Sequence, residues 1–154
     1  MSITYTFFLL HLLSACLWVG GMFFAYFALR PVAANLLEPP LRLPLWDQSF
    51  KRFFSWVWAF ILILPITGYS MIFNNYQTMA NTPISVHIMQ LSGWLMIAIF
   101  IYIYFIPYKK MQLHLTNSKL PEAGTCLNRI RQLVATNLGL GLFTIIIAST
   151  SRFY

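Results

Sequence analysis

Two histidines lie inside long apolar stretches of this sequence, where an imidazole is costly to bury without a partner. His11 is in the first apolar run and His87 is near the start of the third. Ionisable groups at membrane depth are rare, and they usually pair with another group or mark a functional site. A neutral ring nitrogen of imidazole binds iron, copper and zinc. The two histidines are therefore the first candidates for metal ligands.

Depth arithmetic places both histidines on the same side of the bilayer midplane. At the rise of an α-helix, His11 lies about 8 Å and His87 about 13 Å from the middle of its run, toward the same surface. Helix tilt can absorb the difference. The first and third helices of a square bundle lie across its diagonal, about 14 Å apart. The gap suits a flat macrocycle, so the pattern predicts a b-type haem held by the two imidazoles, with a six-coordinate iron suited to electron transfer.

Small residues beside His11 would leave room for the ring of such a cofactor. Helical spacing puts Ser14, Ala15 and Trp18 on the face of His11. Haem propionates would need partners near the surface, and Arg152 is the permanent cation expected on that side. Simpler interpretations stand beside these: a histidine bonded to a neighbouring helix, small residues that only permit close packing, and an arginine that anchors the terminus at the interface.

Methionine offers a second chemistry, because a thioether is a soft ligand for Cu(I). Met71, Met79 and Met89 lie toward the same surface as His87, among seven methionines in the chain. Methionine is also an ordinary membrane residue, and the sequence has no tight Met-x-x-Met cluster. A copper ion is therefore the alternative cofactor.

The composition indicates which kind of element carries these residues. Of the 154 residues, 59% are hydrophobic and 8% are charged, whereas a soluble domain has about 25% charged residues. This excludes an ordinary soluble domain and a disordered chain. The formal net charge is +7, but the basic residues border apolar runs, so we expect them to face anionic lipid and not nucleic acid.

Four apolar runs in the sequence are long enough to cross the hydrocarbon core of a bilayer. In lipid, each backbone polar group needs a partner within its own segment, which only helices and closed barrels provide. We therefore expect one domain, an all-α membrane protein built as a four-transmembrane-helix bundle. The predicted spans are 3–29, 53–73, 84–107 and 133–150.

Basic residues are distributed unequally between the two sides of the predicted bundle. Nine of the ten Lys and Arg residues lie between spans one and two or between spans three and four, and Arg152 is the exception. Loops rich in Lys and Arg stay in the cytoplasm, which predicts a bacterial inner-membrane protein with both termini periplasmic. His114 lies beside Lys109 and Lys110 in the second basic loop, so we interpret it as a solvated surface residue.

Both basic loops contain helix signals. Residues 45–54 mix aromatic and charged side chains, a composition that predicts a short interfacial helix leading into the second span. Pro121 and Glu122 suit the first turn of another helix, which we expect to continue into the fourth span.

Several of these segments are familiar: HLLSACLWVGGMFFAYFALRP (11–31), RFFSWVWAFILILPITGYSMI (52–72), VHIMQLSGWLMI (86–97) and RIRQLVATNLGLG (129–141). They resemble the integral membrane domain of the CopD family, copper resistance protein D, and the resemblance covers almost all of residues 1–154. It implies a role in copper handling. The HemJ-type protoporphyrinogen oxidases, related in layout, place a haem-binding histidine where His11 stands. They carry a basic residue, usually lysine, where this chain has His87, and that departure favours bis-imidazole ligation over porphyrinogen oxidation.

The residues and the resemblance leave several functions open. The leading hypothesis is a b-type haem protein that passes electrons to or from a quinone, a periplasmic redox partner or a small oxidant, which would make it a membrane oxidoreductase. Copper transport or copper resistance is the alternative. A protoporphyrinogen oxidase-like enzyme is a further one, although the predicted spans contain no carboxylate as proton acceptor. A structural subunit, with both histidines only packed, and a homo-oligomer also fit.

Overall fold

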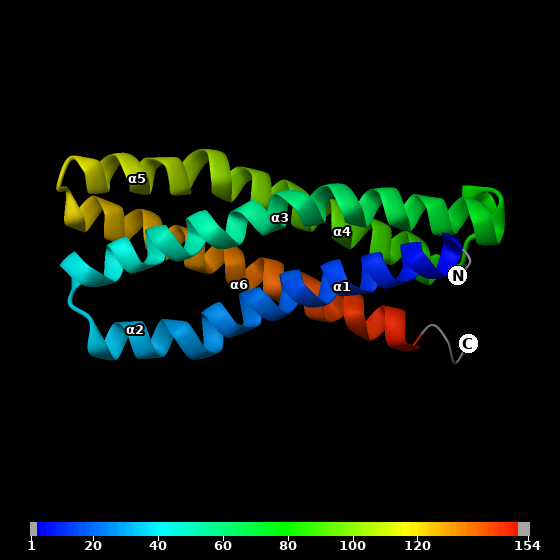
Figure 1. The fold of residues 1–154 in the computed structure, drawn as a ribbon, viewed down its shortest axis with the longest axis horizontal. Helices are drawn as coiled ribbons and strands as arrows, with labels where there is room; N and C mark the ends of the chain where they lie inside the picture. Colours follow the sequence, from blue (N-terminus) through cyan, green and yellow to red (C-terminus); the bar gives the residue numbers. More distant parts are fainter. Residues whose placement is uncertain (1–2, 151–154) are drawn as a thin grey trace.

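Four long helices form an up-and-down bundle in the computed structural model, which describes residues 3–150 (Figure 1). Each of the four is long and apolar enough to cross a membrane. No strand occurs within residues 3–150. These findings confirm the predicted all-α class and the four-helix bundle, and they identify a multi-pass membrane protein.

The first and third long helices each contain a π-helical turn next to a proline. The first consists of α1 (Ile3–Phe23), η1 (Phe24–Leu29) and α2 (Arg30–Leu36), and the third of α4 (Ile84–Ile103), η3 (Tyr104–Tyr108) and α5 (Lys109–Thr116). A proline ring clashes with the carbonyl four residues earlier and lacks the N–H of a helical bond. Pro31 follows η1 and Pro107 lies in η3, so each wider turn accommodates a proline while the helix continues.

The second and fourth long helices are α3 (Pro39–Tyr76) and α6 (Leu120–Thr150), and the short 3-10 turn η2 (Met79–Asn81) precedes α4. Residues 45–54 are helical, as predicted, and form an early part of α3. Pro121 and Glu122 lie in the first turn of α6, also as predicted. With 38 residues, α3 is about 57 Å long. Because the hydrocarbon core is about 30 Å thick, part of α3 must extend beyond it.

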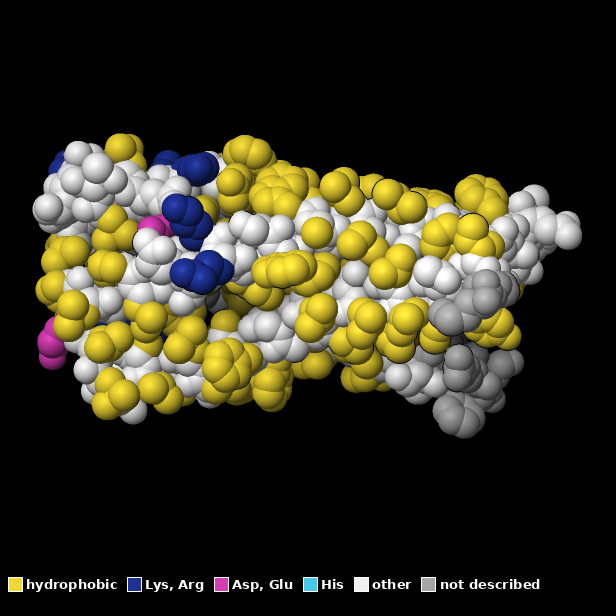
Figure 2. Space-filling view, in the orientation of Figure 1, with side chains coloured by type: hydrophobic (Ala, Val, Ile, Leu, Met, Phe, Trp, Pro, Cys, Tyr) yellow, Lys and Arg dark blue, Asp and Glu magenta, His cyan; other side chains and the backbone are white. Residues whose placement is uncertain are grey.

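The two ends of the bundle differ in charge. Both ends of the described chain and the connection between α3 and α4 lie at one end, which we call the terminal end (Figure 1). The opposite end holds the α2–α3 and α5–α6 connections, and Figure 2 shows blue Lys and Arg side chains gathered toward it. We call it the basic end. The assignment of this end to the cytoplasm stays a prediction.

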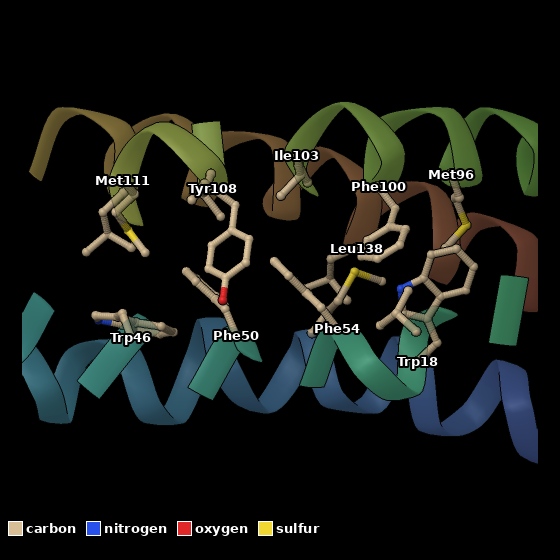
Figure 3. Close-up of a cluster of buried hydrophobic side chains, with 14 of the residues drawn as sticks. Trp18, Trp46, Phe50, Phe54, Met96, Phe100, Ile103, Tyr108, Met111 and Leu138 are labelled. Atoms are coloured by element: carbon tan, nitrogen blue, oxygen red, sulfur yellow. The ribbon is translucent and has the colours of Figure 1, made fainter. Parts of the chain in front are cut away.

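Aromatic side chains fill the middle of the bundle. α1 packs closely against α3, and α4 packs closely against α6. Between α3 and the third long helix, the Phe54 ring lies 5.4 Å from Phe100 and 5.1 Å from Tyr108, centroid to centroid. Figure 3 shows these rings directed toward one another across the core. Edge-to-face contacts of this kind add to the stabilisation from burial.

The outer surface of the bundle is largely apolar. Large hydrophobic side chains such as Leu17, Leu62 and Ile146 are exposed, and yellow side chains cover much of the central part of the molecule in Figure 2. In water an apolar surface of this extent would cause association. In a bilayer the same side chains face lipid tails, so the arrangement fits a membrane-spanning bundle.

Candidate functional site: the intramembrane histidines

His11 lies on the interior face of α1 and contacts α3. Its ring nitrogen Nδ1 is 2.9 Å from the Thr67 hydroxyl oxygen. A Cβ atom added at Gly68 would lie 3.3 Å from Cε1 of His11, so the glycine permits the close approach of ring and helix. Ser14 and Trp18, predicted to share the face of His11, are both buried.

The Thr67 hydroxyl has one proton, and its neighbours indicate where that proton goes. The hydroxyl oxygen is 2.7 Å from the Ile63 carbonyl and 3.2 Å from the Leu64 carbonyl. Because the carbonyl contact is the shortest, we assign Thr67 as donor to Ile63 and as acceptor from Nδ1–H of His11. The tautomer so assigned leaves the Nε2 lone pair of His11 free to bind a metal.

His87 has a partner of the same kind at the terminal end. Its Nε2 atom is 2.7 Å from the Thr82 hydroxyl, which donates to the Met79 carbonyl at 2.7 Å. Because a carbonyl oxygen can only accept, the Thr82 proton is assigned to the Met79 carbonyl; Nε2 of His87 then carries its own proton and Nδ1 is left with its lone pair. A hydrogen bond from the second ring nitrogen is the usual support for a metal-binding histidine, because it selects the tautomer and orients the ring.

The face of α4 that carries His87 looks away from the core. Leu91 and Trp94 share this face and are 72% and 49% exposed. Met96, about 180° around the helix from His87, is 4% exposed. Trp94 and Gln90 donate to the hydroxyl of Tyr69, with the Trp94 nitrogen at 3.3 Å. His87 therefore belongs to an outward-facing seam between α3 and α4.

The two histidines have partners on different sides of α3. His11 contacts Thr67, whereas the face of His87 contacts Tyr69 through Gln90 and Trp94. Residues two positions apart in a helix point about 200° from one another. No contact recorded within residues 3–150 joins the two imidazoles, so their pairing across a haem stays a prediction.

The other predicted site residues have varied surroundings. Trp18 meets Phe100 edge to face at 6.4 Å, and Ala15 is half-buried. Arg152, the predicted propionate partner, lies outside the described residues. Two cavities open at the basic end of the bundle, and neither histidine lines them.

Metal ligands other than imidazole are sparse around both histidines. Within residues 3–150, no group of three or more His, Cys, Asp and Glu side chains could hold a metal ion. Met71, Met79 and Met89 are half-buried, and Met79 is tied to His87 through Thr82. A thioether is a soft ligand that suits Cu(I), so Met79 is the methionine to consider beside His87, although the link through Thr82 runs to its backbone carbonyl.

Sequence reasoning did not assign the two threonines that orient the histidines. Thr67 was a polar residue in an apolar run and Thr82 preceded the Pro83 that opens α4. A hydroxyl in an apolar run is a usable signal, because it can bond a backbone carbonyl of its own helix and still accept a second bond. The histidine from which such a hydroxyl accepts a hydrogen bond depends on how the helices pack.

Fold and site together define an integral membrane bundle with two hydroxyl-oriented histidines toward its terminal end. A family model described as copper resistance protein D, CopD, matches residues 47–151. The chain therefore belongs to the CopD family. No curated protein and no solved structure matches it. The matched region includes His87, Thr82 and Thr67, whereas His11 lies before it.

Proposed function

We propose that this protein handles copper ions in the membrane, as a copper transport or copper resistance protein, with copper as its cargo. The observation that carries the proposal is the CopD match over residues 47–151. That region contains most of α3 and all of α4, α5 and η3, so it includes the outward-facing seam with His87. The haem hypothesis has no corresponding support from a family match.

The proposed copper site is His87 with nearby methionine thioethers. Nδ1 of His87 is the available imidazole donor when Nε2–H is bonded to Thr82. Met79 lies in η2, and its backbone carbonyl accepts from the same threonine, so its thioether is the first candidate, whereas Met89, two residues beyond His87, points to the opposite side of α4. Imidazole and thioether together favour Cu(I) over hard cations such as Mg²⁺. Because His87 lies at the terminal end of the bundle, its position suits uptake or release of an ion at the membrane surface.

His11 is the second imidazole in this proposal. It lies deeper along the bundle than His87, on the interior face of α1, and its Nε2 lone pair is available in the assigned tautomer. Met22, buried on the same interior face, is a thioether deeper still. A copper ion that entered the interior of the bundle would meet these two donors, and neutral donors let a cation move on because they bind it moderately.

Competition for Cu(I) tests the proposal. Purified protein in detergent is titrated against a chromophoric Cu(I) chelator under reducing conditions, and His87→Ala is compared with wild type. We expect wild type to withdraw Cu(I) from the chelator and His87→Ala to withdraw at least about tenfold less, because an imidazole ligand is lost. His114→Ala, which removes a histidine at the basic end, is the matched control and should bind as wild type does. Equal binding by all three proteins would contradict the assignment.

A b-type haem held by His11 and His87 remains the second candidate. One observation favours it: in the assigned tautomers, each imidazole has one ring nitrogen that is not bonded to its threonine. The copper and haem proposals are distinguished by an absorption spectrum, recorded before and after addition of dithionite, of protein expressed with haem supplied. Low-spin haem bands that disappear in both His11→Ala and His87→Ala would replace the copper proposal. A protein without such bands that binds Cu(I) would leave copper as its ligand.

A further inference from the structure

A cavity of about 520 Å³ opens at the basic end of the bundle. It lies between the first turns of α3, which contribute Pro39, Pro40 and Arg42, and the N-terminal part of α6, which contributes Asn128 and Arg131. Its volume is within the range of small-molecule sites, about 300–1,000 Å³. The cavity is separate from both histidines, and the proposed copper chemistry makes no use of it.

The cavity carries positive charge without an acidic partner. Arg42 and Arg131 line it, and Arg131 also lines a smaller neighbouring cavity together with Arg30. The charges of Arg30 and Arg42 both act on Arg131. No Asp or Glu is among the residues that line either cavity. Three guanidinium groups held together in this way repel one another, and an anion between them would remove the repulsion.

The hydrogen-bond donors of these arginines are incompletely used. Nη1 of Arg131 donates to Asn128 at 3.1 Å, but its Nε is buried and has no hydrogen-bond partner among residues 3–150. Arg30 lies over the Tyr26 ring, with Cζ 4.9 Å from the centroid, and this stacking leaves the N–H edge of the guanidinium available. A buried donor without an acceptor costs the full desolvation of that group, so an oxygen-rich ligand would stabilise this end of the bundle.

We propose that this cavity binds a phosphate group, and that its source is the headgroup of an anionic phospholipid. Guanidinium forks bind phosphate oxygens in pairs, which lysine cannot do. Arg30 and Arg131 are the first charged residues beyond the predicted spans 3–29 and 133–150, which is the depth of lipid phosphates. Basic pockets between membrane helices are known sites for anionic headgroups.

The test compares full-length protein in vesicles of phosphatidylcholine alone and of phosphatidylcholine with phosphatidylglycerol. We expect phosphatidylglycerol to raise the Tm of wild type by about 2–4 °C, as for a ligand that binds only the folded state. Arg131→Gln should lose this rise. Arg129→Gln, which removes an exposed arginine of the same helix, is the matched control and should keep it.

Inorganic phosphate, added to the phosphatidylcholine vesicles at matched ionic strength, distinguishes the two sources of the phosphate group. A Tm rise with inorganic phosphate that Arg131→Gln loses would support the site and assign it to a soluble phosphate instead of a lipid. No rise with either ligand, or an equal loss in Arg129→Gln, would overturn the proposal. If Arg131→Gln does not fold, Arg42→Gln on the opposite wall decides the same question.

Discussion

A threonine hydroxyl orients each intramembrane histidine. Thr67 and Thr82 both donate to a backbone carbonyl, at 2.7 Å in each case, and both stand within hydrogen-bond distance of an imidazole nitrogen. The consequence is chemical: the nitrogen bonded to the hydroxyl carries the proton, and the other keeps its lone pair. For His87 this free atom is Nδ1, and for His11 it is Nε2.

Removal of the hydroxyl beside His87 should weaken copper binding without removing a ligand. Thr82→Val keeps the size of the side chain but leaves Nε2–H of His87 without its acceptor. Loss of such a supporting bond lowers metal affinity by about 10–100-fold, and we expect a change in that range in the Cu(I) competition titration. Thr78→Val, at an exposed residue of the same connection, is the control and should not change the affinity. An unchanged Cu(I) affinity in Thr82→Val would show that Thr82 does not support the copper site.

The hydroxyl beside His11 should contribute to stability, because its partner is inside the bundle. Thr67→Val leaves Nδ1–H of His11 without an acceptor, and a buried unsatisfied donor costs about 1–3 kcal/mol. Denaturant unfolding in detergent should show a loss of that size. Thr136→Val removes an exposed hydroxyl that bonds only its own helix, and we expect a much smaller change. Equal losses of unfolding free energy in Thr67→Val and Thr136→Val would mean that the hydrogen bond between Thr67 and His11 does not stabilise the fold.

At the scale of elements, a glycine permits close approach between helices at one point of the bundle, and aromatic rings fill the core at another. A Cβ atom added at Gly141 of α6 would lie 2.7 Å from Val19 of α1 and 3.2 Å from Met96 of α4. Gly141 is thus the point at which three helices converge. Between α3 and the third long helix, aromatic rings such as Phe54 and Phe100 meet edge to face.

Substitution of Gly141 should therefore destabilise the bundle. Gly141→Ala forces Val19 or the α1 backbone to move, and overpacking of this kind costs about 1–3 kcal/mol. Gly139→Ala makes the same chemical change where nothing lies within 4 Å, and it should be neutral or stabilising because alanine favours helix. Thermal unfolding in one detergent compares the pair. A Gly141→Ala protein as stable as Gly139→Ala would contradict the packing at this point.

At the scale of the whole molecule, the charge difference between the two ends sets the expected orientation. Figure 2 shows the basic side chains toward one end, and the positive-inside rule assigns that end to the cytoplasm. The copper site would then face the periplasm, and the arginine-lined cavity would face the inner leaflet. The two proposed sites, for copper and for lipid, would then lie on opposite sides of the membrane.

Cysteine labelling tests the orientation. Single cysteines are introduced as Asn75→Cys at the terminal end and Asn117→Cys at the basic end, both at exposed residues, after Cys16 and Cys126 are replaced by serine. A membrane-impermeant thiol reagent added to spheroplasts should label Asn75→Cys directly and Asn117→Cys only after permeabilisation. The opposite pattern would invert the topology and place the proposed copper site in the cytoplasm.

The sequence alone was enough for the class, the number of long helices and the position of charge along them. These properties depend on runs of apolar residues and on local helix signals, such as Pro121 and Glu122 at the start of α6, which need no knowledge of neighbours. The helices predicted at the start of α3 and α6 were confirmed, but the continuation of the first long helix to Leu36 was not captured, because segments outside the hydrocarbon are mixed in polarity and are stabilised by packing against one another.

Tertiary structure decided what the sequence left open about the site. Depth along the spans placed His11 and His87 in the same half of the membrane, and their pairing across a haem stays a prediction, but the neighbours of each side chain depend on rotation about the helix axis, which packing sets. That rotation places His11 against Thr67 and turns the face of His87 outward, beside Leu91 and Trp94. It also brings Arg30, Arg42 and Arg131, far apart along the chain, to adjoining cavities. Such proximity arises only when separate helices meet, and no local pattern encodes it.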